Sequence, residues 1–122
     1  MYTLDTNAVI YYLQKDEAVR AVIEPMLEAG AVHVATVTEI ELFSYTHLTL
    51  DDNNRIEKLL DAFEIVPLDS NIARIAGRLR REQRMKLPDS VIAATALFTG
   101  TTLVTRNIRD FKRIPNLSVE KI

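Results

Sequence analysis

The sequence predicts an α/β protein in which helices cover both faces of a mostly parallel sheet. Segments with the apolar spacing of helices alternate with short apolar runs rich in β-branched residues along the 122 residues. Strands that alternate with helices form parallel sheets, because each helix returns the chain to the edge where the next strand starts. The sequence contains no repeat, low-complexity tract or linker, so we expect residues 1–122 to form one domain.

The expected strands and helices follow one another in a regular order. Strands are expected at 2–5, 31–35, 64–68, 101–105 and, last, 118–121. Helices are expected at 7–14, 17–28, 38–48, 51–63, 69–84 and 88–97, followed by one helical turn at 107–112. Gly30 and Gly100 stand where two of these helices end, a position that glycine favours.

The composition is that of an ordinary globular protein, with 48% hydrophobic and 26% charged residues. The absence of cysteine excludes disulfides, zinc–thiolate sites and thiol nucleophiles, and with no visible signal peptide it leads us to expect a cytoplasmic protein. No apolar run approaches the roughly 20 residues of a membrane span. The net charge of −2 argues against a generally basic nucleic-acid binder, so any such contact must use local basic patches.

Four acidic residues are expected at one edge of the sheet. Asp5 ends the first strand, Glu41 lies in the first turns of the helix after the second, Asp89 begins the helix before the fourth, and Asp110 follows the fourth. Right-handed crossovers bring such positions to the same edge, where open α/β sheets bind ligands. Carboxylates gathered there repel one another unless a cation lies between them. This pattern predicts a site for a divalent, oxygen-seeking metal ion.

Each of these acids also has a purely structural interpretation. Asp5 is a common type of helix N-cap, and Asp89 after a proline is a common helix start. Asn107 with Asp110 three residues later resembles a capping box.

Glu41 has both an alternative role and a competitor. It can be an ordinary solvated residue of its helix, and Glu39 lies only two positions before it. Residues two apart point to nearly opposite sides of a helix, so only one of the two can face the site.

Four short motifs follow one another along nearly the whole chain. They are Leu4-Asp5-Thr6-Asn7, Thr38-Glu39-Ile40-Glu41-Leu42, Leu87-Pro88-Asp89-Ser90-Val91-Ile92-Ala93-Ala94-Thr95-Ala96 and Leu103-Val104-Thr105-Arg106-Asn107-Ile108-Arg109-Asp110-Phe111. In this order and at these separations, they resemble the PIN domain family, and within it the VapC-type toxins of type II toxin–antitoxin modules.

This resemblance implies a fold, an activity and partners. The fold would be a three-layer α/β/α sandwich, and the activity cleavage of RNA by an endoribonuclease that uses Mg²⁺ or Mn²⁺. The implied partners are RNA and a cognate antitoxin, with a homodimer as the expected assembly and no membrane contact. The implied catalytic and metal-binding residues are Asp5, Glu41, Asp89 and Asp110, so the resemblance selects Glu41 over Glu39. Supporting hydrogen bonds are expected from Thr6, Asn7, Thr105 and Asn107.

Basic side chains must guide a polyanion into an acidic site. Arg106, Arg109 and Lys112 follow the fourth strand and are expected to contact RNA phosphates, although they can equally receive acidic groups of an antitoxin. The densest basic run lies in the helix expected at 69–84 and just beyond it, where a solvated helix face and an RNA contact both stay open.

Two further functions stay open. A phosphatase could use Asp5 as a covalent nucleophile, but such folds usually carry a second aspartate two residues later, where this chain has Asn7. A PIN-like module could also bind RNA or protein without cleaving. Loss of an acid would favour that alternative, and none of the four is missing.

Overall fold

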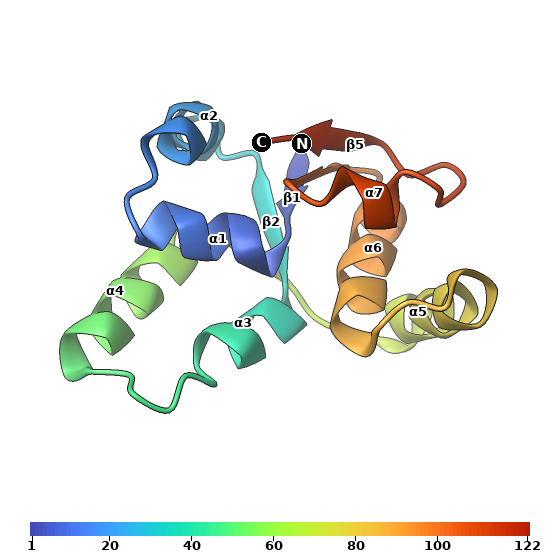
Figure 1. Cartoon of the computed structure of the whole chain (residues 1–122), viewed down its shortest axis with the longest axis horizontal. Helices are drawn as coiled ribbons and strands as arrows, with labels where there is room; N and C mark the ends of the chain where they lie inside the picture. Colours follow the sequence, from blue (N-terminus) through green and yellow to red (C-terminus); the bar gives the residue numbers. More distant parts are fainter.

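A computed structural model describes all 122 residues as a five-stranded sheet with helices on both faces (Figure 1). The strands are β1 (Tyr2–Leu4), β2 (Val32–Ala35), β3 (Glu64–Val66), β4 (Thr102–Thr105) and β5 (Val119–Lys121). They lie in the order β3-β2-β1-β4-β5, and every neighbouring pair is parallel. The expected α/β class, the parallel sheet and the fifth strand are therefore confirmed.

Seven helices connect and flank the strands. They are α1 (Thr6–Leu13), α2 (Glu17–Glu28), α3 (Thr36–Leu42), α4 (Leu50–Leu60), α5 (Ser70–Gln83), α6 (Leu87–Thr99) and α7 (Ile108–Phe111). Four of them begin at a side chain that accepts a backbone N–H of the first turn, which satisfies a donor that the helix itself leaves free. These caps are Asp5, Asp16, Thr49 and Asp69. None of the seven helices is both long and apolar enough to span a membrane.

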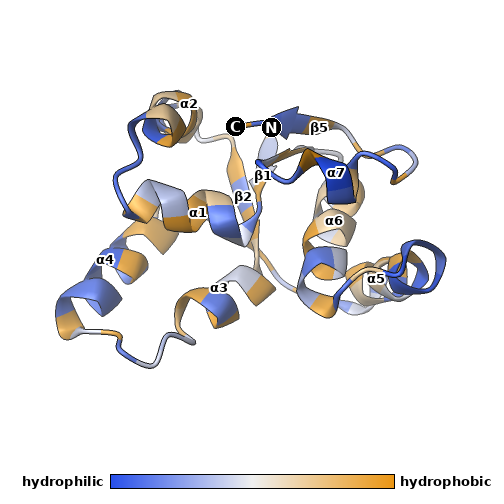
Figure 2. Ribbon diagram, in the orientation of Figure 1, coloured by the Kyte–Doolittle hydropathy of each residue, from blue (hydrophilic) through white to orange (hydrophobic).

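The strands supply apolar side chains to two cores, one on each face of the sheet, because successive residues of a strand point to opposite faces. Leu4 and Val104 pack with residues of α1, α2 and α4, whereas Leu103 packs with residues of α5 and α6. The helix α6 buries all seven residues of 90–96, since it contacts both α5 and the sheet. Figure 2 shows the resulting contrast between the largely apolar residues of α6 and the many hydrophilic residues of α5 and α7.

The helix expected at 38–48 is shorter and begins earlier. The helix α3 starts at Thr36, directly after β2, and ends at Leu42. The following residues 43–46 (Phe-Ser-Tyr-Thr) have modest helix propensity, and the Ser44 hydroxyl donates to the carbonyl of Ile40, a bond that often accompanies bending of a helix. A capping box at Thr49 then starts α4. Glu41 consequently lies in the last turn of a seven-residue helix, not in the first turns of a longer helix as expected.

The chain changes direction across the sheet between β1 and β4. From β1 it moves outward to β2 and β3, then crosses to β4 on the other side of β1 and continues to β5. The register pairs Leu4 with Val104, so the next residues, Asp5 and Thr105, emerge together at the carboxyl edge. Ligands of open α/β sheets bind at such a switch point.

Candidate metal centre

Asp5 lies at the centre of the carboxyl edge and is only 5% exposed. Its Oδ1 accepts the backbone N–H of Ala8 over 2.8 Å, and its Oδ2 accepts the hydroxyl of Thr105 over 2.5 Å. Burial raises the pKa of Asp5, the charge of Glu41 adds to the rise, and the two hydrogen bonds oppose it. Asp5 is therefore both the cap of α1, as its structural interpretation required, and a buried carboxylate at the switch point.

A chain of hydrogen bonds connects Asp5 to the fourth acid. Thr105 Oγ1, which donates to Asp5, accepts the backbone N–H of Asn107 over 2.9 Å. The side-chain amide of Asn107 in turn donates to Asp110 over 2.6 Å. Asn107 occupies the N-cap position of α7 but makes no side-chain capping bond, so the capping box that its spacing suggests does not form.

Glu41, rather than Glu39, is the glutamate that reaches the site. The hydroxyl of Thr6 donates to Glu41 Oε1 over 2.6 Å and lies 3.0 Å from the hydroxyl of Thr38. Glu39 lines a separate shallow pocket with Phe43 and residues of α4. The contribution of Thr38 was not predicted, although its position one helical turn before Glu41 was a usable signal.

The pKa of Asp89 is affected by all three other acids. It is the third residue of α6 and half-buried, and the N-cap position belongs to Lys86, so Asp89 does not cap the helix. Burial raises the pKa of Asp89 most, and the negative charges of Asp110, Asp5 and Glu41 raise it further, whereas the nearby charge of Lys86 lowers it. The four acids therefore share one electrostatic environment.

The donor set suits a hard divalent cation that keeps part of its water. The four carboxylates do not place three groups around a common point at ligating distance. None of them forms an ion pair with Lys or Arg, since the ion pairs are His33–Glu64 and Arg106–Asp16. Their mutual repulsion is thus left without a neutralising partner, which is the condition that a bound cation would relieve. Mg²⁺ retains several waters and often needs only one or two direct carboxylate ligands.

The remaining residues expected at the site are placed less centrally. Asn7 is exposed on α1 and takes no part in the hydrogen bonds described above, and Arg109 and Lys112 are exposed at α7. The guanidinium of Arg106 donates to Asp16 over 2.9 Å and lies over the ring of Tyr11, 4.4 Å from its centroid. Nothing in the local sequence pattern predicts this arrangement, because the Arg106–Asp16 pair spans 90 positions.

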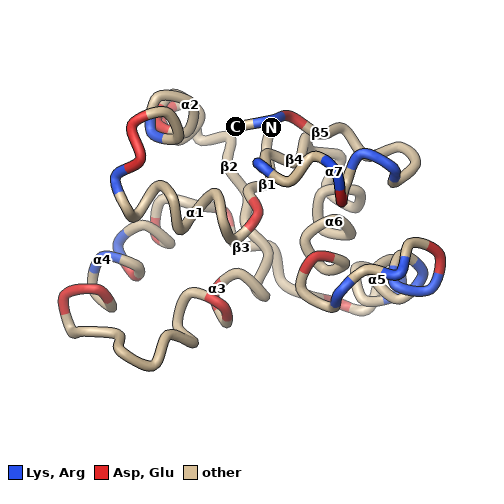
Figure 3. The backbone as a smooth tube through the Cα atoms, viewed as in Figure 1, with Lys and Arg blue, Asp and Glu red and all other residues tan.

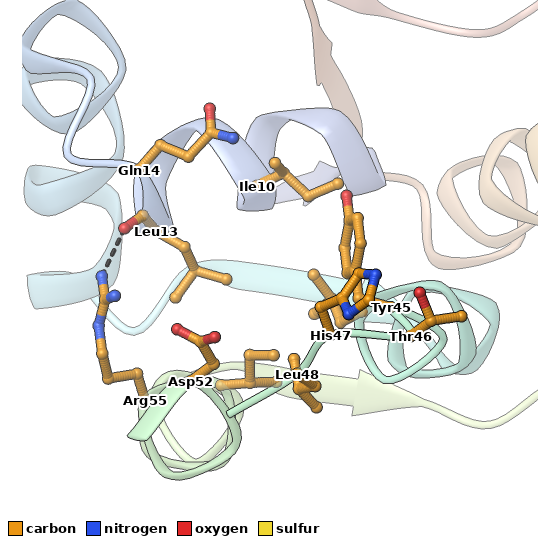
Figure 4. Close-up of a pocket in the computed structure, with 11 residues that line it drawn as sticks. Ile10, Leu13, Gln14, Tyr45, Thr46, His47, Leu48, Asp52 and Arg55 are labelled. Atoms are coloured by element: carbon orange, nitrogen blue, oxygen red, sulfur yellow. Dashed lines mark hydrogen bonds between the residues drawn. The ribbon is translucent and has the colours of Figure 1, made fainter. Parts of the chain in front are cut away.

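A pocket of about 400 Å³ lies apart from the acids (Figure 4). It is formed by the end of α1, the segment between α3 and α4, and α4 itself, and more than half of its lining residues are hydrophobic. Arg55 crosses one end of it and donates to the backbone carbonyl of Leu13 over 2.5 Å. None of the four acids lines this pocket, so it is distinct from the candidate metal centre.

Residues 2–117 match the model of the PIN domain family. This chain belongs to the PIN domain family. The match covers every element that positions the acids, from β1 through α7.

The curated relatives of this PIN domain are VapC ribonucleases, so the resemblance to VapC-type members is confirmed. Ribonuclease VapC2 of Rickettsia felis is 29% identical, with 98% of this chain and 96% of that protein covered. The tRNA(fMet)-specific endonuclease VapC of Salmonella typhimurium is 28% identical with the same coverage, 98% and 96%. Ribonuclease VapC51 of Mycobacterium tuberculosis is 33% identical over 76% of this chain and 70% of its own.

Solved structures show the same fold. The VapBC2 complex of Rickettsia felis bound to a promoter DNA fragment contains a chain with a TM-score of 0.87 and 26% identity, over 99% of this PIN domain and 98% of that chain. A toxin–antitoxin complex from Klebsiella pneumoniae contains one with a TM-score of 0.81 and 28% identity, and both chains are covered completely. The α/β/α arrangement implied by the resemblance is confirmed.

Proposed function

We propose that this PIN domain is a Mg²⁺- or Mn²⁺-dependent endoribonuclease and the toxin of a type II toxin–antitoxin module. The relatives named as ribonucleases and the toxin–antitoxin complexes among similar structures support the activity class and its biological setting. The observation that supports the metal dependence is that Asp5, Glu41, Asp89 and Asp110 meet at one edge of the sheet without an ion-pair partner; burial raises the pKa of Asp89, and the charges of the other three acids raise it further. We take residues 1–122 as one PIN-like domain.

The four acids have different roles in this proposal. Asp5, Glu41 and Asp89 would hold it directly or through water, and Asp110 would hold a second ion or orient the attacking water. A bound divalent ion supplies charge neutralisation at the phosphoryl oxygens and activation of a water molecule. The hydroxyl of Thr105 fixes the orientation of Asp5, since it donates to Asp5 Oδ2.

Two of the remaining three carboxylates are held in the same manner. The hydroxyl of Thr6 fixes Glu41, and the amide of Asn107 fixes Asp110. These neutral donors orient the carboxylates without cancelling their charge, so the acids keep their attraction for a cation.

A phosphatase that uses Asp5 as a nucleophile fits the structure less well. Both carboxylate oxygens of Asp5 already accept a hydrogen bond, from Ala8 and from Thr105. The 5% exposure of Asp5 leaves little room for the in-line approach of a substrate phosphorus, whereas a metal ion can bind the lone pairs that these hydrogen bonds leave free. A binding module without activity would not need four acids held at one edge.

A cognate antitoxin is the protein partner that fits the acidic site. An Arg or Lys side chain of the antitoxin placed among the four acids would offset their repulsion and occupy the place of the metal. We expect the protein to act in the cytoplasm, where its RNA substrate is, and to form a homodimer.

Growth assays test this function. Expression of the wild-type chain alone should slow bacterial growth, and co-expression of the antitoxin from the neighbouring gene should restore it. Asp5→Asn and Asp89→Asn should fold but not slow growth. A wild-type protein that cleaves RNA in vitro yet leaves growth unchanged would contradict the toxin role, and a protein that cleaves no RNA would contradict the nuclease role.

A further inference from the structure

The charge of this chain is divided between two parts of the fold. Residues 1–69 carry four Lys or Arg and thirteen Asp or Glu, whereas residues 70–117 carry ten Lys or Arg and only three Asp or Glu. Two of those three acids are Asp89 and Asp110 of the candidate metal centre. Figure 3 shows the basic residues gathered on α5 and around α7, while acidic residues are spread over the segment between α1 and α2 and over α2, α3 and α4. The net charge of −2 conceals this division.

The outer face of α5 carries a row of arginines. Arg74, Arg78 and Arg81 are exposed and follow the i, i+4, i+7 spacing of one helix face. The opposite face of α5 is buried through Ile72 and Leu79. The row extends about 10 Å along the helix, given a rise of 1.5 Å per residue.

These arginines have no ionic partner in the folded chain. Arg106 alone, among the ten cations of residues 70–117, is part of an ion pair. Like charges three or four positions apart on a helix repel, so the row destabilises α5 rather than supporting it. A helix face that serves only for solubility would normally intersperse both signs of charge, whereas Glu82 is the single acid of α5 and forms no ion pair with the row. An anionic ligand would relieve the repulsion.

The arginine row continues toward the acids through two links. Arg113 donates to the backbone carbonyl of Gln83 over 2.7 Å and so joins the segment after α7 to the end of α5. Lys86, at the N-cap position of α6, lies close enough to Asp89 for its charge to act on that carboxyl. The basic surface therefore runs from the outer face of α5 to the rim of the candidate metal centre.

We propose that this surface binds the RNA backbone mainly on one side of the scissile bond, because the acidic residues 1–69 offer few cations to the other side. The surface consists of Arg74, Arg78, Arg81, Arg84, Arg109 and Lys112, all exposed. The inference rests on the proposed ribonuclease function and adds to it an asymmetric substrate footprint. Arg80 is left out, because it already donates to the carbonyl of Met85 over 3.3 Å.

RNA fits this surface better than an acidic protein does. Guanidinium groups match phosphate oxygens in a bidentate manner, and five of the six surface residues are arginines. The surface also ends at the acids that would carry out the cleavage, so a bound strand would be led to them. The 1–69 part, with its excess of nine negative charges, would repel the same strand.

Salt-dependent binding provides the first test, with a charge-matched control. The row variant Arg74→Gln/Arg78→Gln/Arg81→Gln and the control Lys15→Gln/Lys58→Gln/Lys121→Gln each remove three exposed positive charges. Both are made in an Asp5→Asn background, so that the probe, unfractionated tRNA, is not cleaved. Because each phosphate contact contributes about 0.7 (single strand) to 0.9 (duplex) to the slope of log K against log salt, the row variant should lose about 2 to 3 from the magnitude of that slope. The control should keep it.

Equal slopes for the row variant and the control would overturn the proposal. Loss of antitoxin binding by the row variant, with RNA binding intact, would overturn it in favour of an acidic protein partner. The melting temperature of the row variant should be equal to or above that of the parent, since its repulsion is relieved. Misfolding of the row variant is therefore not expected to account for its loss of RNA binding.

The one-sided footprint has a kinetic test. After the cleavage site is mapped with wild-type protein, short RNAs are extended by six nucleotides on only the 5′ or only the 3′ side. In the wild-type protein, one of the two extensions should raise kcat/KM at least tenfold by lowering KM. The control Lys15→Gln/Lys58→Gln/Lys121→Gln, made here without Asp5→Asn, should show the same gain. The row variant should lose that gain and keep the kcat of the short RNA.

Equal gains from both extensions, or a gain that the row variant keeps, would contradict the one-sided surface while leaving the nuclease intact. Absence of cleavage of any RNA by the wild-type protein would instead show that the proposed function itself is wrong.

Discussion

The hydroxyl of Thr105 donates a hydrogen bond to the carboxylate of Asp5 over 2.5 Å, although the two residues are 100 positions apart. The parallel register of β1 and β4, which pairs Leu4 with Val104, creates this contact directly beyond the last paired residues. Thr105 also accepts the backbone N–H of Asn107, so one hydroxyl fixes the first acid and the turn that carries the fourth. The switch point of the sheet is thereby joined to the candidate metal centre.

Thr105→Val should weaken both folding and cleavage. Valine keeps the shape but removes the donor to Asp5 and leaves the Asn107 N–H without its acceptor. Loss of hydrogen bonding to a buried charged group should lower the free energy of unfolding by about 1–3 kcal/mol, measured by urea denaturation. RNA cleavage should fall about 10–100-fold, as for other residues that orient metal ligands. Thr105→Ser retains the hydroxyl and should recover most of the activity; a fully active valine variant would show that the bond does not position Asp5.

Asp89→Asn should stabilise the metal-free protein at neutral pH while reducing cleavage by at least about 100-fold. Burial and the charges of Asp110, Asp5 and Glu41 raise the pKa of Asp89, so the folded state binds this proton more tightly than the unfolded state does. Ionisation of Asp89 therefore destabilises the fold as pH rises from about 4 through the folded pKa, and it has no effect at lower pH.

Chemical denaturation in EDTA across pH measures this difference. The variant should be similar to wild type at pH 3 and more stable than wild type at pH 7. A variant that is less stable than wild type at pH 7 would mean that the Asp89 carboxylate is favourably paired in the folded protein.

The two glutamates of α3 form a matched pair. Glu41→Gln removes a carboxylate that the Thr6 hydroxyl directs toward the site, so cleavage should fall by at least about 100-fold. Glu39→Gln changes a residue that lines a different pocket, and its activity should stay within about twofold of wild type. Cleavage assays on both purified variants measure this difference. Loss of activity in Glu39→Gln but not in Glu41→Gln would mean that Glu39, and not Glu41, faces the candidate metal centre.

Arg106 should contribute to RNA affinity more than to chemistry. Its guanidinium is held between Asp16 and the ring of Tyr11, and its backbone directly follows Thr105, which donates to Asp5. Arg106→Gln should raise KM several-fold and leave kcat nearly unchanged, because a phosphate contact made equally in ground and transition states affects binding alone.

Asp16→Asn is the complementary change. Asparagine can still cap α2 by accepting the N–H of Val19, but it no longer neutralises Arg106. KM for RNA should therefore stay the same or fall. A large loss of kcat in either variant, measured by steady-state kinetics, would place this pair in the chemistry instead.

Much of the site was predictable because its residues stand at ends of elements. Asp5 directly follows a short apolar strand, and Asp89 follows a proline at a helix start, so alternation of elements and right-handed connections placed both on one edge. Glu41 was placed at this edge although its helix was expected to end at residue 48, six residues after the observed end at Leu42. Both ends lie after Glu41, so the difference did not affect its placement.

Contacts across the sheet were not predictable from the sequence. The bonds of Thr105 to Asp5 and of Arg106 to Asp16 span 100 and 90 positions. They depend on strand register and on how α1 and α2 pack, which periodicity does not specify. The end of α3 was missed for a different reason, since the sequence of 43–48 lacks glycine and proline, and its termination follows from a side-chain bond of Ser44 and the new cap at Thr49.

Cleavage of RNA by the purified protein, with and without a chelator, tests whether the four acids act through a bound divalent ion. If Asp5, Glu41, Asp89 and Asp110 hold a divalent ion, wild-type protein should cleave RNA in Mg²⁺ or Mn²⁺, lose the activity in EDTA, and regain it when the ion is restored in excess. The Asp5→Asn protein, purified in parallel, should be inactive under all these conditions and so exclude a contaminating nuclease. Cleavage by wild type that persists in EDTA, with the Asp5→Asn preparation inactive, would contradict the metal centre.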